Sequence, residues 1–415
     1  MNSRERIYAA INHEEPDRIP VDLGATNTTS ISAIAYSRLK KYLGIKSGHV
    51  RIYDVAQQLA QPENMVLDRF LVDAIDVGRI YNRKDEDWYD VNVNGIEAQF
   101  PVWFKPKFNE DNSIEVLHAD GTVLARMSEA AKVIDQTYFP CKDKYPENMN
   151  DLLKAIPKMA GFEMITAPMD HLNQRGFWRD FRRKAIDFKK NTDRALCLGA
   201  GVSFFQFGTA LIPMDKFLID IMRHPAEVEK FLDLVLEFQK VSLRMICKYV
   251  GDLVDIICIG DDYGENNGLI MNPDIFRELI KPKLKVVCDY IKKNSDMKIF
   301  LHSCGSIVPI IPDIIEIGID ILNPVQINTR DMDPKFLKEN FGDEITFWGG
   351  GVDTRNVLPR KSPEEVKKHV TELLEIFAPG GGYVWNTVHN ILPDVPPENI
   401  VAMFEAIQNY NNEYF

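Results

Sequence analysis

The sequence lacks the features that mark membrane proteins, secreted proteins and nucleic-acid-binding proteins. It contains no run of about eighteen apolar residues, so we expect no membrane-spanning helix and no membrane partner. The N-terminus, Met-Asn-Ser-Arg-Glu-Arg, lacks the apolar core of a secretory signal, which favours a cytoplasmic location. Basic residues are fewer than acidic ones, with 49 Lys and Arg against 61 Asp and Glu, and the formal net charge is −12. This acidic balance argues against nucleic acid as a partner.

Cysteine is also scarce, and its spacing is irregular. The six cysteines show no framework of disulfide spacings, which fits a reducing compartment where a single cysteine is core, nucleophile or metal ligand. We find neither an internal repeat nor a low-complexity tract.

What the sequence does contain is an alternation of short apolar runs with amphipathic stretches. Strand-like runs span residues 73–80, 194–201, 254–260, 297–301, 319–323, 345–350 and 382–386, and helical stretches follow most of them, at 214–222, 225–250, 272–294, 333–340, 363–377 and 397–410. This order predicts an α/β fold, a TIM (β/α)8 barrel forming one domain over residues 1–415. One strand of the eight is missing from this count, and we place it near 204–207 or 133–137.

The N-terminal region predicts smaller elements. Residues 3–11 predict a helix with Ser3 as N-cap and Arg6 on an exposed face, and residues 21–24 a short strand. Residues 54–70 predict another helix.

Residues 81–145 have a different pattern from the rest. Alternating segments surround an Asn-Gly pair at 94–95 and an Asp-Gly pair at 120–121, which predicts β-hairpins. We therefore expect a β-rich insertion near the barrel mouth, acting either as a substrate lid or as a plain surface flap.

The stretch Ile299-Phe300-Leu301-His302-Ser303-Cys304-Gly305 is the centre of the functional argument. A buried strand ends there in His302 and Cys304, and side chains just past the carboxyl end of a barrel strand face the active-site mouth. Two residues apart on an extended chain, they point the same way and form half of a zinc site. The alternative is a buried thiol beside a hydrogen-bonded histidine.

Other strand ends carry polar residues as well. Asp261, Asp262 and Glu265 follow the strand that ends at Gly260, either as catalytic or metal-binding carboxylates or as caps of the helix after Asn272.

Amides and a histidine follow later strands. Asn323, Gln326 and Asn386 are candidate substrate contacts, and His389 could meet His302 and Cys304 because strand ends of a closed barrel share one mouth. His389 is then either a third metal ligand or a substrate contact.

Taken together, these segments resemble the uroporphyrinogen decarboxylase superfamily along nearly the whole chain. The resemblance rests on SRERIYAAINHEEPDRIPVDLG, GDDYGENNGLIMNPDIFRELIKPKLK, FLHSCGSI, DILNPVQ, FWGGGVDTRN and APGGGYVWNTVHNILPDVPPENI. It implies a TIM barrel, and homodimers are common in that superfamily.

Two branches of the superfamily compete, and the sequence favours one. True decarboxylases carry an arginine-rich stretch for the porphyrinogen carboxylates where this chain has Pro20-Val21-Asp22-Leu23-Gly24-Ala25-Thr26-Asn27. The zinc methyltransferases hold zinc with a His-x-Cys pair, matched by His302 and Cys304, and a later Cys. His389 occupies the position of that later Cys, so Asp262 or Glu265 remains an alternative third ligand.

The resemblance therefore implies a zinc-dependent methyltransferase that works with a corrinoid carried by another protein. Its small substrate would be an O-methyl donor, such as an aromatic methyl ether, or a thiol acceptor. No Asp-x-His-x-x-Gly stretch for binding a corrinoid occurs in this chain. The alternative function is a metal-free decarboxylase of a carboxylated small molecule.

Overall fold

A seven-stranded parallel sheet is the framework of the protein, described by a computed structural model over residues 1–415. In sheet order the strands are β4 (Ala74–Asp76), β11 (Ala195–Gly199), β12 (Ile256–Gly260), β15 (Lys298–His302), β16 (Ile321–Asn323), β17 (Thr346–Trp348) and β18 (Tyr383–Val384). Every two neighbouring strands are parallel, and the seven strands follow one another across the sheet in the order of the chain, as in a (β/α) barrel. The seven predicted strand positions are confirmed, although β4 ends at Asp76, before a 3-10 turn over Val77–Ile80.

Residues 20–22 occupy the eighth position of the barrel. The amide of Trp385 donates to Pro20 O at 2.8 Å, and the amide of Asp22 donates to Trp385 O at 2.9 Å. On the other side, the amide of Asp73 donates to Val21 O at 2.7 Å. This short segment therefore joins β18 to β4 and closes the ring. Our two placements of the missing strand were wrong, because 204–207 enters helix α7 and 133–137 contributes β10 to a separate sheet.

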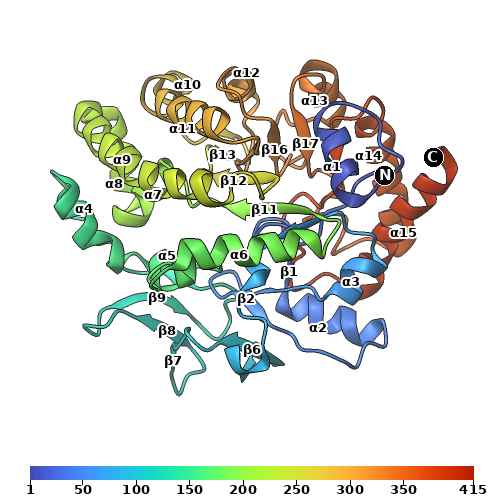
Figure 1. The fold of residues 1–415 in the computed structure, drawn as a ribbon, viewed down its shortest axis with the longest axis horizontal. Coiled ribbons are helices and arrows are strands. Elements are labelled where there is room, and N and C mark those ends of the chain that lie inside the picture. The colour runs from blue at the N-terminus through green and yellow to red at the C-terminus, as the bar shows by residue number, and fades with distance from the viewer.

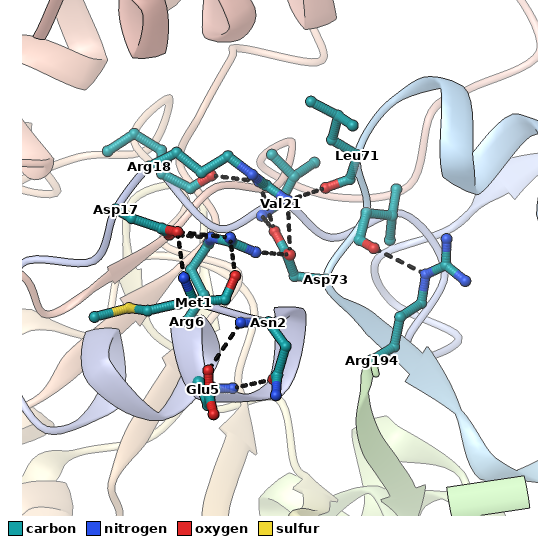
Figure 2. Close-up of polar contacts among 12 residues, drawn as sticks. Met1, Asn2, Glu5, Arg6, Asp17, Arg18, Val21, Leu71, Asp73 and Arg194 are labelled. Atoms are coloured by element: carbon teal, nitrogen blue, oxygen red, sulfur yellow. Dashed lines mark hydrogen bonds and ion pairs between the residues drawn. The ribbon is translucent and has the colours of Figure 1, made fainter. Parts of the chain in front are cut away.

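An ion-pair network holds this closing segment in place (Figure 2). The carboxylate of Asp73 accepts hydrogen bonds from Arg6 Nη1 at 2.7 Å, from Arg18 Nη1 and Nη2 at 2.8 Å each, and from the amide of Val21 at 3.0 Å. Arg6 also pairs with Asp17. The expected exposure of Arg6 was wrong: its side chain is 7% exposed, because these two carboxylates satisfy its charge inside the protein.

The helices surround the sheet, and in Figure 1 both termini lie on the same side of the molecule. Long helices bury an apolar stripe at helical spacing; α9, for example, buries Val228, Phe231, Leu232 and Val235. The helices are α1 (Ser3–Ile11), α2 (Ala33–Tyr42), α3 (Asn64–Arg69), α4 (Met149–Ala155), α5 (Ala160–Glu163), α6 (Phe177–Lys190), α7 (Phe205–Leu211), α8 (Met214–Arg223), α9 (Pro225–Val250), α10 (Pro273–Ile275), α11 (Lys281–Asn294), α12 (Ile311–Glu316), α13 (Pro334–Phe341), α14 (Pro363–Phe377) and α15 (Pro397–Tyr414). No helix combines the length and the apolar character that crossing a membrane requires.

The first helix packs against the barrel interior. Ile7, Ala10 and Ile11 of α1 belong to the same buried cluster as Phe300 and Trp348 from the strands. The N-cap of α1 is Asn2, one residue before the predicted Ser3, with Glu5 completing a capping box.

The β-rich stretch forms two sheets beside the barrel. Asn94 and Gly95 have φ values of 54° and 76°, as a type I′ turn requires, and they join β5 (Trp88–Val93) to β6 (Ile96–Pro101). The second sheet contains β7 (Lys107–Phe108), β8 (Ile114–Leu117), β9 (Val123–Met127) and β10 (Asp135–Gln136). Two further small sheets pair β1 (Ile31–Ser32), β2 (Ile52–Asp54) and β3 (Leu59–Ala60), and β13 (Gly264–Glu265) with β14 (Gly268–Leu269).

The helix predicted over residues 54–70 was wrong in its first half. Asp54 ends β2, and its carboxylate accepts hydrogen bonds from the amide and the side chain of Gln57, which turns the chain. Pro62 then delays helix α3 until Asn64.

Candidate metal centre

Three side chains that can bind a metal converge at the carboxyl end of the barrel. His302 ends β15, Cys304 follows it by two residues, and His389 follows β18. One ligand atom from each lies within 4.8 Å of those of the other two, and Cys304 Sγ lies 3.3 Å from His302 Nε2. The structure thus brings together the three residues that the sequence predicts as metal ligands.

A chain of hydrogen bonds orients His302. Its Nδ1 lies 2.6 Å from Asn323 Oδ1, and Asn323 Nδ2 donates to Trp348 O at 2.7 Å. Because the amide nitrogen is engaged with a carbonyl, its oxygen must accept, so we assign the proton of His302 to Nδ1. Nε2 then carries the lone pair and is directed toward Cys304.

His389 lies with its ring centroid 5.5 Å from that of His302. Burial and, to a smaller extent, the neighbouring His302 lower the pKa of His389 to about 4, while Asp262 opposes the shift. The imidazole is therefore neutral near pH 7, the form in which histidine binds metals.

Asp262 lies beside this group. Its Oδ1 accepts the amide hydrogen of Cys304 at 2.8 Å and lies 3.6 Å from His302 Nε2, while Oδ2 accepts from Gln206 Nε2 at 2.8 Å. Burial and the charge of Asp262 raise the pKa of Cys304. The thiol therefore keeps its proton until a metal ion displaces it or a base accepts it.

The other two predicted carboxylates lie elsewhere. Asp261 points to the start of α7, where it accepts from the amides of Phe204, Phe205 and Gln206 at 2.6 to 2.8 Å. Burial raises its pKa to about 6. Asp261 therefore caps a helix, although a different one from the helix at Asn272, and Glu265 is exposed on β13 outside the cluster. We correct the expectation that these two act at the reaction centre.

The predicted substrate amides hold the site together instead of facing its cavity. Asn323 is fully buried and binds His302 as described. Gln326 Oε1 accepts the amide hydrogen of Gly305 at 2.7 Å, next to Cys304. Asn386 Nδ2 donates to Asp22 O at 3.1 Å, at the barrel closure. None of the three amides lines the cavity, which corrects their predicted role.

A cavity of about 470 Å³ opens beside the cluster. His302, His389 and Asp262 line one part of it. The remaining wall comes from residues 25–28, Tyr53, Gln57, Asp76, 165–169, Gly199, 201–203, Gln206, 258–260 and Phe300. No lysine or arginine lines it, and its only acidic side chains are Asp76 and Asp262.

Asp76 is the residue that the sequence analysis missed. It ends β4, and burial raises its pKa to about 7. The apolar run 73–80 was read as one strand passing through Asp76, so the carboxylate did not stand out as a strand end. The signal was present in the 3-10 turn signature Asp-x-Gly, where Asp76 Oδ1 accepts the amide hydrogen of Gly78 at 2.8 Å.

The donor set fits zinc. Donors on a tetrahedral zinc ion, with bonds of roughly 2.0 Å to nitrogen and 2.3 Å to sulfur, are roughly 3.5 Å apart. The 3.3 Å between Cys304 Sγ and His302 Nε2 agrees with this spacing, and the neutral imidazole of His389 supplies a third donor. One thiolate and two imidazoles suit zinc, and three ligands leave a position open toward the cavity.

Comparison with known proteins identifies related sequences. The family model described as uroporphyrinogen decarboxylase (URO-D) matches residues 182–410. A uroporphyrinogen decarboxylase of Magnetococcus marinus is 25% identical over 147 residues, which are 34% of this chain and 38% of that protein. Another, of Serratia proteamaculans, is 43% identical over 77 residues, 19% of this chain and 21% of that protein. The chain thus aligns with well under two thirds of these relatives.

One solved structure matches over the full length. It is described as a methyltransferase from Methanosarcina mazei, is 17% identical in sequence, and superposes with a TM-score of 0.58 over 99% of both chains. At this identity the match establishes the shared fold.

Proposed function

Because the chain belongs to the uroporphyrinogen decarboxylase family, we propose that it is an enzyme of the methyltransferase branch of that family. In this proposal it moves a methyl group between a small methylated compound and a corrinoid carried by a separate protein, in the cytoplasm. The substrate is an O-methyl donor, such as an aromatic methyl ether, or a thiol acceptor. The fold shared with the Methanosarcina mazei methyltransferase supports this proposal.

The observation that carries the proposal is the convergence of His302, Cys304 and His389, with the two histidines lining the cavity. These three residues would hold the zinc. Bound there, zinc supplies Lewis acidity, which makes an ether oxygen a better leaving group or stabilises a thiolate acceptor.

The protein's own groups prepare the site for binding. Asn323 fixes the tautomer of His302, so that Nε2 is free to bind metal. Asp262 is a base next to Cys304 and can take the proton that its thiol must lose. Asp262 also faces the cavity, where it can hold or remove a proton of the substrate. Outer groups of this kind raise metal affinity by orienting the ligands.

The competing function, decarboxylation of a carboxylated small molecule, fits the cavity poorly. A substrate rich in carboxylates needs cationic partners, and neither lysine nor arginine lines the wall. Asp76 and Asp262 would instead repel the anion.

Metal content and methyl transfer test the proposal. We would measure zinc by mass spectrometry in the wild type and in His302→Ala, Cys304→Ala and His389→Ala, with exposed His224→Ala and remote Cys141→Ala as controls. We expect about one zinc per chain in the wild type and controls, with loss in the three site variants. Transfer to a reduced corrinoid protein should follow zinc content. If protein expressed in zinc-supplied medium contained no zinc, the methyltransferase proposal would be rejected in favour of the decarboxylase.

A further inference from the structure

The end of the cavity that contains Asp76 has a distinct chemistry. A small second hollow of about 10 Å³ adjoins the main cavity there, and the two share Tyr53, Asp76 and Ala167 in their walls. Asp170 and Trp103 line the second hollow. We call Tyr53, Asp76, Trp103 and Asp170 the acidic end of the cavity.

Both carboxylates of the acidic end have unused acceptor capacity. Asp76 accepts one hydrogen bond, on Oδ1 from Gly78, and its Oδ2 has no hydrogen-bond partner. Asp170 accepts from Asn82 Nδ2 at 3.0 Å through Oδ2, while its Oδ1 is buried without a partner. The side chain of Asp170 is only 2% exposed. A buried carboxylate oxygen without a full hydrogen bond is costly. The indole N–H of Trp103 lies beside Asp170, but neither Trp103 Nε1 nor Asp170 Oδ1 has a partner at hydrogen-bond geometry, so the acidic end can take a donor from a ligand.

Two basic side chains lie near these carboxylates, Arg79 by Asp76 and His171 by Asp170, but the side chain of neither donates a hydrogen bond to them. Neither Asp76 nor Asp170 forms an ion pair with lysine or arginine, and neither residue type lines the second hollow. The charge of Arg79 partly offsets the rise in the pKa of Asp76, but its side chain donates to Pro62 O at 2.6 Å and not to Asp76.

The one basic side chain near Asp170 is His171, and both of its ring nitrogens have other partners. His171 Nε2 lies 3.6 Å from Asp170 Oδ1, but it also lies 3.2 Å from Asn82 Oδ1. Asn82 Nδ2 donates to Asp170, so its oxygen must accept from His171 Nε2–H. The Nδ1 atom lies 2.6 Å from Gln174 Nε2, so the hydrogen bonds of the His171 ring go to Asn82 and Gln174 and not to Asp170.

Aromatic rings add to the preference of the acidic end for a cation. Tyr53 and Trp103 line the hollow, and Tyr81 and Trp88 complete its wall. The faces of such rings attract cations, most strongly when water is excluded.

From these contacts we propose that the substrate carries a primary ammonium group, which binds at the acidic end between Asp76 and Asp170. A hollow of about 10 Å³ holds roughly one water-sized group, which suits an –NH3⁺ head and excludes a trimethylammonium. The remainder of the molecule extends through the main cavity toward His302 and His389. The three N–H donors of the ammonium group would satisfy the open oxygens of Asp76 and Asp170. Assigning the methyl group to the opposite end rests on the proposed function.

The raised pKa values agree with this binding mode. Burial raises the pKa of Asp76 to about 7 and also raises that of Asp170. A bound cation offsets the cost of ionising both groups.

A matched series of ligands tests the charge preference. We would measure binding of 3-methoxypropylammonium, 3-methoxypropanol and 3-methoxypropanoate to the zinc-supplied protein by calorimetry at about pH 8, where Asp76 is ionised. The three differ in the charge of one end and share the methyl ether at the other. We expect the ammonium to bind at least about tenfold more tightly than the alcohol, since one charged hydrogen bond is worth about 1.5–3 kcal/mol, and the carboxylate to bind most weakly.

Variants of the two carboxylates test whether they cause the preference for the ammonium ligand. Asp76→Asn and Asp170→Asn should each reduce the ammonium-to-alcohol ratio toward one, whereas exposed Asp143→Asn, with the same change in net charge, should leave it unchanged. Circular dichroism confirms folding, and either folded variant suffices for the test. Equal binding of ammonium and alcohol, no binding of any ligand, or a ratio unchanged in the folded variants would overturn the inference.

The zinc-free variant separates the two proposals. His302→Ala should lose zinc and keep the ammonium preference. If the wild type bound no zinc or transferred no methyl group but still preferred the ammonium ligand, the proposed function would be rejected and the ammonium site would stand.

Discussion

The imidazole of His302 and the amide of Asn323 form one unit, with 2.6 Å between Nδ1 and Oδ1. The amide cannot rotate without losing its bond to Trp348 O, so a residue of the neighbouring strand, 21 positions along the chain, sets which nitrogen of His302 is free. Outer partners of this kind are worth about 10–100-fold in metal affinity.

We therefore predict that Asn323→Ala weakens zinc binding by about 10–100-fold, because His302 Nδ1 loses its acceptor. Asn323→Asp keeps an acceptor for Nδ1 but loses the donor to Trp348, and should be affected less. Competition with a chelator measures both. Zinc affinity in Asn323→Ala equal to that of the wild type would mean that Asn323 does not orient the ligand.

Gly305 sets the course of the chain directly after Cys304. Its φ is 89°, and an added Cβ would lie 2.2 Å from the carbonyl carbon of Gly264. We predict that Gly305→Ala costs about 2–4 kcal/mol in unfolding free energy, combining backbone strain with displacement of a neighbouring main chain. It should also lower zinc content, because Cys304 shifts.

Gly121→Ala is the matched control for Gly305→Ala. Its φ of 87° is nearly the same, but nothing lies within 4 Å of the added Cβ. This variant should lose only about 1 kcal/mol and keep its zinc. Equal losses in the two variants would assign the whole effect to backbone conformation.

The buried ion pair at the barrel closure gives a prediction about stability. Arg6→Ala leaves the carboxylate of Asp73 with one fewer cation inside the protein, and should reduce the free energy of unfolding by about 3–5 kcal/mol. Denaturant titration measures this change. Arg330→Ala, which removes an exposed ion pair with Asp331, should change stability by less than about 1 kcal/mol. A similarly small loss in Arg6→Ala would show that Arg18 alone compensates Asp73.

Asp22 gives a prediction about pH. It is fully buried and accepts a hydrogen bond from Trp348 Nε1 at 2.9 Å, and burial raises its pKa to about 6. Because the folded protein holds this proton more tightly than the unfolded chain, Asp22 lowers the unfolding free energy as pH rises from about 4 to about 6. The contribution is flat above the folded pKa.

The variant Asp22→Asn should remove this dependence. Its stability relative to the wild type should rise by on the order of 2 kcal/mol between pH 4 and pH 7, measured by denaturant unfolding at each pH. A difference that does not change with pH would mean that Asp22 stays in one protonation state.

The sequence predicted the sheet and the position of His302 and Cys304 at a strand end well, because strands buried on both faces appear as unbroken apolar runs. A polar residue that ends such a run stands out, as His302 does. His389 followed from barrel topology, which brings strand ends together whatever their separation in the chain.

The failures have a different cause. The exposure of Arg6 depended on Asp73, which is 67 positions away, and no local pattern records that pairing. Asp261 and Asp262 are neighbours of the same type, yet one caps α7 and the other lies by Cys304, since successive side chains at a strand end point to opposite sides.

The closing segment at residues 20–22 also has a consequence for synthesis of the protein on the ribosome. Val21 emerges early, but its partner Trp385 is made only after every other strand of the barrel. Until then the segment 20–22 lacks its neighbour β18, and each newly made strand presents an unpaired edge to other chains. The nascent protein must therefore remain an open sheet for most of its translation, the interval in which a chaperone would protect it best.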